Sequence, residues 1–390
     1  MMALKLALRN LIGAGLRTWL NVIVLSFSFV VIIWHKGFLD AWERQAKTDM
    51  IAWELGGGQY REQHYDPYDP FTLTDSHNRI PETFTANIHR GEMTPVLITQ
   101  GTIYPSGRMQ SIVVKGIDPD QSVLSIPSAR LDSAVDDIPA IIGSSMAASA
   151  RLKEGDYVIL RWRDKNGAFD AAEISIAGIF STTVPTVDAG QIWIPLHELQ
   201  RMMLLTGEAT VLVVKDKEAS WPAVEGWKFN NQELLLADIN RMIKSKTAGG
   251  AILWTILLAL AMLGVFDSQV LSIFRRQKEI GTYIALGMTR SQVVSLFTAE
   301  GAMHSVLAAL LGAVYGIPLL TLQAIKGLSL PVSSKDFGVS MAETIYPVYS
   351  MGLIISTVVI IIITTTLVSY WPSRRISKMK PTDALRGKVQ

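Results

Sequence analysis

The residues of this chain whose types could support catalysis or metal binding are few and scattered. The six histidines are dispersed, and His197-Glu198 lacks the second histidine, four residues after the first, that an H-E-x-x-H zinc site requires. The chain contains neither the G-x-x-x-x-G-K-[ST] loop that binds ATP phosphates nor the G-x-S-x-G turn of serine hydrolases. Because it has no cysteine, disulfides and thiolate metal sites are excluded. The sequence therefore predicts no catalytic residues, no metal ligands and no cofactor bound by this chain.

Four stretches of the chain are long and apolar enough to be transmembrane helices. About 20 residues, each rising ~1.5 Å, cross a hydrocarbon core of ~30 Å. The predicted spans are residues 18–36, 247–274, 299–325 and 346–372. The preceding segment, residues 1–17, has leucines at helical spacing, which favours an interfacial helix on the cytoplasmic leaflet over a simple basic flank.

A charged segment between the second and third spans is the candidate binding site. Residues 274–293 read FRRQKEIGTYIALGMTRSQV. As a docking helix, this segment would use three charges for orientation and an apolar edge for contact, namely Arg276, Lys278, Glu279, Ile280, Ile284 and Leu286. Gly281 and Gly287 would permit close approach or a bend, at a helix cost of about 1 kcal/mol each. The alternative is an ordinary basic loop held in the cytoplasm by its charge.

Two acidic residues, Asp267 and Glu300, lie close to the ends of predicted spans. Ionisable groups at such positions are functional hypotheses by default, because charge is costly within the bilayer. Each could pair with a neighbouring span, or could reach the headgroups as an ordinary boundary residue. The sequence leaves both alternatives open for both residues.

Basic residues near the span ends indicate the orientation of the chain. Lysine and arginine outnumber acids before the first span, in the 275–295 loop and in the 373–390 tail. The 326–345 loop is balanced, and the 37–246 segment is acidic overall. The sequence therefore predicts a multi-pass protein of the plasma (inner) membrane, with both termini and the 275–295 loop in the cytoplasm and the large segment outside.

The large segment, residues 37–246, has the pattern of a mixed α/β domain with helical stalks. Paired strands are predicted at 94–105 and 108–118, and a hairpin at 156–180 with its turn at Asn166-Gly167. Helices are predicted at 144–152 and 231–246. The polar, aromatic segment at 59–75 could be a loop, a sheet edge or part of a ligand-facing rim.

Short motifs at both ends and in the centre of the chain occur together. The centre has Arg-Arg-Gln-Lys-Glu-Ile-Gly at 275–281, Ala-Leu-Gly at 285–287 and Glu300-Gly301. The N-terminus contains ALRNLIGAGLRTWL and the C-terminus PSRRISKMKPTDALRGK. With four spans and one large domain after the first, these motifs resemble the FtsX/MacB-type (type VII) permeases of ABC transporters. VVKGIDPDQ, IIGSSMAASARLKEGDYVIL and ISIAGIFSTTVPTVDAGQIWIPLHELQRMM resemble the lipoprotein-releasing LolC/LolE branch.

The resemblance implies four transmembrane helices and, between the first two, a large extracytoplasmic α/β domain of the MacB-like periplasmic core type. It implies that the 274–293 segment is a coupling helix docking on a separate cytoplasmic ATPase, present in two copies, which binds ATP and magnesium. Further implied partners are a second permease copy or paralogue, the lipid bilayer, a lipoprotein substrate and a periplasmic carrier, but no nucleic acid.

The function that the resemblance implies is release of lipoproteins from the inner membrane. One alternative is a MacB-like mechanotransmission exporter of peptides, toxins or drugs. Another is an FtsX-like regulator of a cell-wall hydrolase, and a third is a membrane-anchored sensor without an ATPase.

Overall fold

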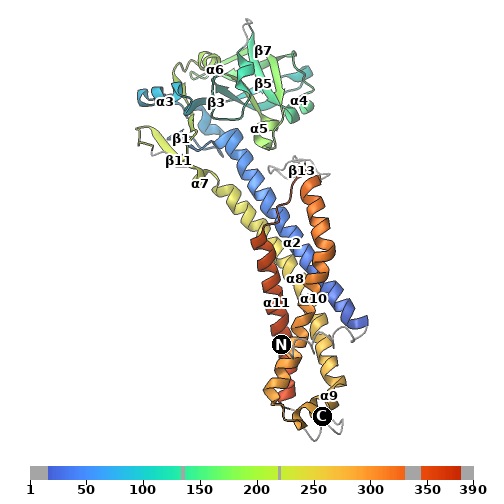
Figure 1. Cartoon of the computed structure of the whole chain (residues 1–390). Helices are drawn as coiled ribbons and strands as arrows, with labels where there is room; N and C mark the ends of the chain where they lie inside the picture. The colour runs from blue at the N-terminus through green and yellow to red at the C-terminus, as the bar shows by residue number, and fades with distance from the viewer. Residues whose placement is uncertain (1–15, 133–136, 218–220, 330–343, 379–390) are drawn as a thin grey trace. The chain divides into compact units, whose positions relative to one another are not determined.

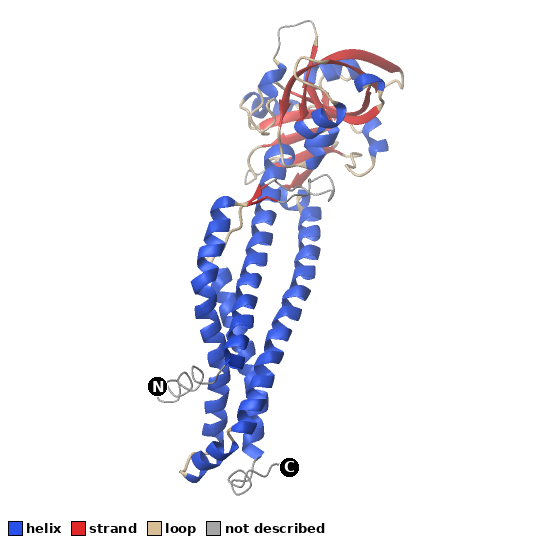
Figure 2. Cartoon of the chain, turned by 90° about the vertical axis from the view of Figure 1, so that its right-hand side faces the viewer, coloured by secondary structure: helices blue, strands red, loops and turns tan. Residues whose placement is uncertain are grey.

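The computed structural model describes residues 16–132, 137–217, 221–329 and 344–378, which form two compact units. The helical unit contains the described residues up to Trp42, then Ile243–Ser329, then those from Thr344 onward. The β-rich unit contains the described residues of Glu43–Met242. Long helices make up the first unit, and strands with short helices make up the second (Figure 1, Figure 2).

Four long helices account for most of the helical unit. They are α2 (Leu16–Met50), α8 (Ala237–Arg275), α10 (Arg290–Lys326) and α11 (Met351–Ser373). The shorter elements are α9 (Gln277–Ala285), η7 (Arg374–Lys378) and the paired strands β12 (Leu328–Ser329) and β13 (Thr344–Ile345). Within the described residues, the four helices are each long and apolar enough to cross a membrane. The prediction of four helices long and apolar enough to span a membrane is confirmed.

The start of α10 differs from the predicted start of the third span. The helix begins at Arg290, so the predicted 275–295 loop contains α9 and the first residues of α10. A capping box produces this start: the Thr289 hydroxyl accepts from the Gln292 amide, and the Gln292 side chain accepts from the Thr289 amide. The predicted interfacial helix at 1–17 lies outside the described residues, except for Leu16 and Arg17 at the start of α2.

Helix α2 lies against α8, α10 and α11 within the helical unit. Buried apolar side chains from these helices form one cluster, comprising Val22, Leu25, Phe29, Ile32, Ala261, Met262, Val265, Ala308 and Ile361. Asn21 Nδ2 donates to the Gly264 carbonyl at 3.0 Å, which ties α2 to α8. Small residues at such contacts let membrane helices approach closely, which matters where lipid provides no hydrophobic driving force.

The β-rich unit is built on one large sheet. In spatial order its strands are β11 (Trp227–Asn231), β1 (Gly58–Glu62), β10 (Val211–Val214), β3 (Met93–Ile103), β4 (Gln110–Ile117), β8 (Gln191–Pro195), β5 (Ile138–Gly143), β7 (Phe169–Phe180) and β6 (Tyr157–Arg163). The smaller strands are β2 (Asn78–Arg79) and β9 (Glu208–Ala209), which pair with each other.

Strand β3 closes part of this sheet into a ring. Its residues Met93–Val96 pair with β10, whereas Gly101–Ile103 pair with β6, the last strand in the order. The ring therefore runs β3, β4, β8, β5, β7, β6 and back to β3, while β10, β1 and β11 extend from it. Fully buried side chains fill its interior, among them Val114, Ile142, Leu160 and Ile192.

Short helices lie between the strands. They are η1 (Ile51–Leu55), η2 (Pro70–Thr74), η3 (Glu82–Phe84), α3 (Thr85–His89), η4 (Pro105–Gly107), η5 (Ser128–Leu131), α4 (Ser144–Ala150), α5 (Pro185–Gly190), α6 (Leu196–Met203) and α7 (Gln232–Leu235). Helix α6 adds Leu196 and Leu199 to the apolar cluster inside the ring.

The secondary structure predicted for this segment matches the structure closely. The predicted strands at 94–105 and 108–118 are β3 and β4, which pair antiparallel. The predicted hairpin is β6 and β7, with Gly167 at φ 83° in the turn, a conformation that glycine adopts without strain. The 59–75 segment starts within β1 and ends just after η2, whose Pro70 and Phe71 line a cavity of about 360 Å³ beside β3 and β6.

Candidate coupling site

Helix α9 is separated from α8 by a single residue, Arg276. Its backbone (φ −103°, ψ 20°) interrupts the helical geometry, so that the chain changes direction between Arg275 and Gln277. The hydrogen-bonded path nevertheless continues, since the Arg276 amide donates to the Ser272 carbonyl and the Ile280 amide donates to the Arg276 carbonyl. The charged 274–293 segment therefore contains a short helix, held between two long ones.

The Arg276 side chain fixes the start of α9 to α10. Its Nη1 lies 2.8 Å from both carboxylate oxygens of Glu300, and its Nε lies 2.7 Å from Oε2 of Glu279. The guanidinium also stacks over the Phe297 ring, with its carbon 4.9 Å from the ring centre. Burial alone would lower the pKa of Arg276, but the hydrogen bonds and charges of Glu279 and Glu300 outweigh it and raise that pKa.

The sequence left open whether Glu300 pairs within the protein or reaches the headgroups, and this ion pair shows that it pairs within the protein. The carboxylate is 7% exposed and pairs with Arg276. Asp267, by contrast, is exposed on α8. The two acids near span ends therefore lie in different environments. Glu300 joins α10 to the α8–α9 junction, whereas Asp267 presents its charge on the outer surface of the helical unit.

The prediction that Ile280 belongs to an apolar docking edge is wrong. The Ile280 side chain is fully buried, in a cluster with Ile273, Val293, Val294, Phe297 and Ile376. The neighbouring Gly281 is also buried. The covering residues come from α8, α10 and η7, so this face of α9 packs against other parts of the same chain. Arg276 likewise acts as an internal tie, since its side chain is only 18% exposed.

The exposed face of α9 is smaller than predicted and mostly polar. Lys278, Glu279 and Thr282 are exposed on the helix, and Leu286 just beyond it is 79% exposed. Ile284 is partly buried. Gly287, at φ 99°, ends the helix in a conformation that favours glycine. We call Lys278, Glu279, Thr282 and Leu286 the exposed α9 face.

A group of buried polar residues beside this site was missed by sequence reasoning. Gln269 on α8 and Ser369 on α11 meet at Gly301, where an added Cβ would overlap Ser369 and lie 3.0 Å from the Gln269 amide nitrogen. One signal was available: Thr357, Thr365, Ser369 and Ser373, all buried, recur on one face of α11 at intervals of four or eight residues. A polar stripe within an apolar helix indicates a face turned away from lipid.

Among the described residues, no group of three or more His, Asp or Glu side chains is placed to hold a metal ion. The arrangement at α9 is that of an exposed short helix anchored by an ion pair and an apolar cluster.

Comparison with known proteins relates the helical unit to a transporter family. Residues 251–381 match the FtsX-like permease C-terminal family. LolC, the lipoprotein-releasing system transmembrane protein of Xylella fastidiosa, is 21% identical in an alignment of 306 residues that covers 72% of this chain and 74% of LolC. LolC of Neisseria meningitidis is 20% identical over 330 residues, covering 75% and 77%. The macrolide export protein MacB of Wolinella succinogenes is 26% identical over 162 residues, covering 42% and 23%.

These matches support an ABC transporter permease of the FtsX/MacB type. The LolC relatives match along most of both chains, whereas MacB matches over a shorter stretch. Permeases of this family are transport subunits and not catalytic ones. The family match includes α9, Arg276 and Glu300, so the site described above lies within the permease domain.

Proposed function

We propose that this permease couples ATP hydrolysis by a separate cytoplasmic ATPase, present in two copies, to movement of its extracytoplasmic β-rich unit. The observation that carries the proposal is the exposed α9 face, which is fixed to α10 through Arg276 and Glu300. ATP and magnesium would be bound by the ATPase. The second permease subunit would be another copy or a paralogue.

The orientation that we propose for the chain in the membrane rests on the charge distribution and on packing within the helical unit. Ile376, after α11, packs in the same cluster as Ile280 on α9. The basic residues of η7 and the basic α9 segment therefore lie at one end of the unit, which the positive-inside rule assigns to the cytoplasm. Helices α2 and α8 continue along the chain into the β-rich unit, for which we propose an extracytoplasmic location.

Changing the exposed α9 face is expected to detach the ATPase. In the Lys278→Glu/Leu286→Asp double variant, we expect ATPase copurification to fall at least about tenfold, because central contact residues each contribute more than about 1 kcal/mol to binding. Both side chains are exposed, so the permease itself should fold normally. The measurement is the amount of ATPase retained on affinity-purified permease from membranes.

The matched control is Leu234→Asp, a leucine in α7 of the β-rich unit that is 57% exposed. It introduces the same substitution as Leu286→Asp, away from α9, and should retain the ATPase. Undiminished copurification with the double variant would refute α9 as the coupling helix and would favour a sensor that works without an ATPase.

Lipoprotein release is the transport function that we propose for this permease. Support comes from the LolC relatives and from the exposed apolar side chains on α2 and α8, which are Leu20, Ile23, Val24, Phe27, Ile252, Leu253, Ile256, Leu260 and Leu263. Each CH₂ group of an acyl chain buried in the bilayer contributes about 0.8 kcal/mol, so extraction needs ATP. A periplasmic carrier would receive the lipoprotein.

A photoreactive residue on α8 is expected to crosslink to lipoprotein acyl chains. At Ile256, which is 55% exposed, we expect adducts with acylated lipoprotein and none with the same protein lacking its acylated cysteine. Ile363 on α11, 54% exposed, is the control position and should give no such adduct. Immunoblotting for the lipoprotein in crosslinked membranes provides the readout.

The match to MacB supports one alternative, an exporter of soluble peptides, toxins or drugs. Adducts that form independently of acylation would favour that exporter. ATPase binding without any transported adduct would favour an FtsX-like regulator of a cell-wall hydrolase.

A further inference from the structure

Helices α2 and α10 touch through two glycines one turn apart. A Cβ added to Gly316 would lie 2.7 Å from Val30 Cγ2, and one added to Gly312 would lie 3.4 Å from the Ser26 carbonyl oxygen. The spacing Gly312-x-x-x-Gly316 is the small-residue pattern that lets membrane helices pack closely. Tyr315, between the glycines, places its hydroxyl 3.3 Å from the Ser26 hydroxyl.

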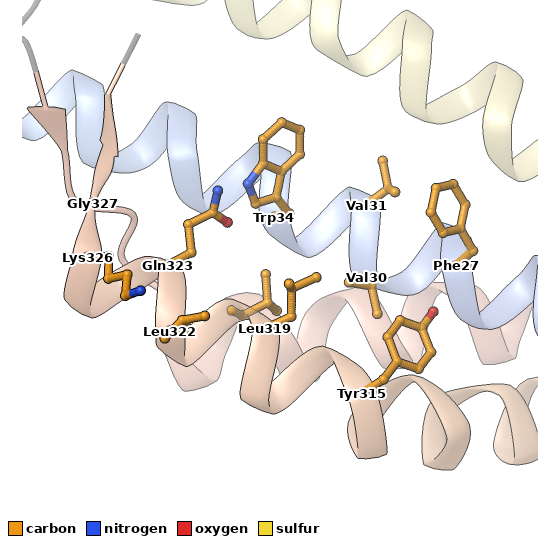
Figure 3. A pocket seen from close by; sticks show the side chains of 11 residues that line it. Phe27, Val30, Val31, Trp34, Tyr315, Leu319, Leu322, Gln323, Lys326 and Gly327 are labelled. Atoms are coloured by element: carbon orange, nitrogen blue, oxygen red, sulfur yellow. The ribbon is translucent and has the colours of Figure 1, made fainter.

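From this contact toward Lys326, the two helices enclose a cavity of about 450 Å³ (Figure 3). Apolar and aromatic side chains form most of its wall, namely Phe27, Val30, Val31, Trp34, Tyr315, Leu319, Leu320 and Leu322. From Tyr315 to Lys326 the wall follows α10 for about 16 Å at the usual rise per residue. We call this cavity the α2–α10 groove, and its length and lining suit a hydrocarbon chain.

The end of the groove near the C-terminus of α10 is polar and positively charged. Gln323 and Lys326 lie there with Trp34 (Figure 3), and none of the lining residues is acidic. The Gln323 side-chain oxygen accepts from the Tyr349 hydroxyl at 3.4 Å, so its NH₂ group is the part that can donate to a ligand. Indole and lysine side chains both favour the headgroup level of a membrane, with their apolar parts in the hydrocarbon.

We propose that the α2–α10 groove binds a phospholipid with an anionic headgroup. One acyl chain lies between α2 and α10, and the phosphate is held by Lys326 and Gln323. A lipoprotein fits this charge pattern less well, because its diacylglycerol is joined through a neutral thioether and carries no phosphate. The groove lies between α2 and α10, whereas the surface proposed for transported acyl chains is on α2 and α8; Phe27 belongs to both.

Photocrosslinking in nanodiscs of stated composition tests this proposal. The full-length permease, with benzoylphenylalanine at Leu322, is placed in equal amounts of phosphatidylglycerol and phosphatidylcholine. Mass spectrometry then gives the ratio of the two lipids among the adducts. We expect about fivefold enrichment of phosphatidylglycerol, the preference that one lysine near an anionic headgroup provides. Lys326→Gln should return the ratio to that of the nanodisc.

Ile325 is the matched control position, because it is 72% exposed on the same helix at nearly the same depth and does not line the groove. Its adducts should reflect the bulk lipid ratio. Val31→Trp, which fills the groove from α2, should reduce the yield of all lipid adducts at Leu322 and leave Ile325 unchanged. Equal lipid ratios at Leu322 and Ile325, or enrichment that survives Lys326→Gln, would overturn the proposal. So would adducts at Leu322 with copurified lipoprotein in place of phospholipid.

Discussion

Replacing Gly301 with leucine is expected to prevent the helical unit from packing, and replacing it with alanine should lower the free energy of unfolding by about 1–3 kcal/mol. An added Cβ overlaps both the hydroxyl and the Cβ of Ser369, so side-chain rotation alone cannot relieve the overlap. The α10 and α11 backbones must then move apart at a point where Gln269 and Ser369 are also buried. Thermal and chemical unfolding of the purified permease in detergent measures the change.

Two further variants separate this steric effect from a general effect of substituting glycine. Gly249, in α8, has open space around its Cβ position, so Gly249→Ala should leave stability unchanged or raise it by up to about 1 kcal/mol through helix propensity. Gly301→Ala combined with Ser369→Gly removes the overlapping atoms and should recover most of the lost stability. If the combined variant is no more stable than Gly301→Ala alone, close packing at Ser369 is not the reason for a glycine at 301.

Hydropathy predicted the spanning helices because a bilayer requires long apolar segments, whatever their partners. Hydropathy placed the start of the third span at residue 299, because Arg290 and its polar neighbours are typical of a loop. The hydrogen bonds of the Thr289 and Gln292 capping box start the helix earlier. Local hairpins in the β-rich unit were also predictable, because turn residues specify them. Closure of the ring through β3 and β6 was not, because that pairing joins strands separated by more than fifty residues and leaves no local signal.

The candidate site could likewise be predicted only in part. Its segment could be located from charge and glycine spacing, but the roles of its side chains depend on residues far along the chain. Ile280 has the periodicity of an exposed apolar edge, yet Phe297 and Ile376 cover it. Periodicity identifies an apolar face without identifying what covers it. Glu300 was similarly ambiguous until its distance to Arg276 was known.

The Arg276–Glu300 pair links the α8–α9 junction to α10, and removing either partner is expected to destabilise the permease. Arg276→Met leaves the buried Glu300 carboxylate without its arginine, so we expect a loss of about 3–5 kcal/mol in the free energy of unfolding. Glu300→Gln should cost less, because Arg276 retains Glu279. The double variant removes both charges and should be more stable than Arg276→Met alone. Unfolding in detergent gives the free energy of unfolding of all three variants. The double-mutant cycle then isolates the interaction energy between Arg276 and Glu300.

Glu279→Gln is the matched control for this cycle, because it breaks the bond of the same arginine to an acid that is 54% exposed. Exposed ion pairs contribute between about 0 and 1 kcal/mol, so its stability should be close to that of the unmodified chain. ATP hydrolysis by the assembled transporter adds a functional readout. If α9 transmits force through this pair, the double variant should bind the ATPase normally and yet lose transport per ATP hydrolysed. Normal transport by a stable double variant would show that the pair only stabilises the fold, and coupling would then have to pass through the apolar cluster around Ile280.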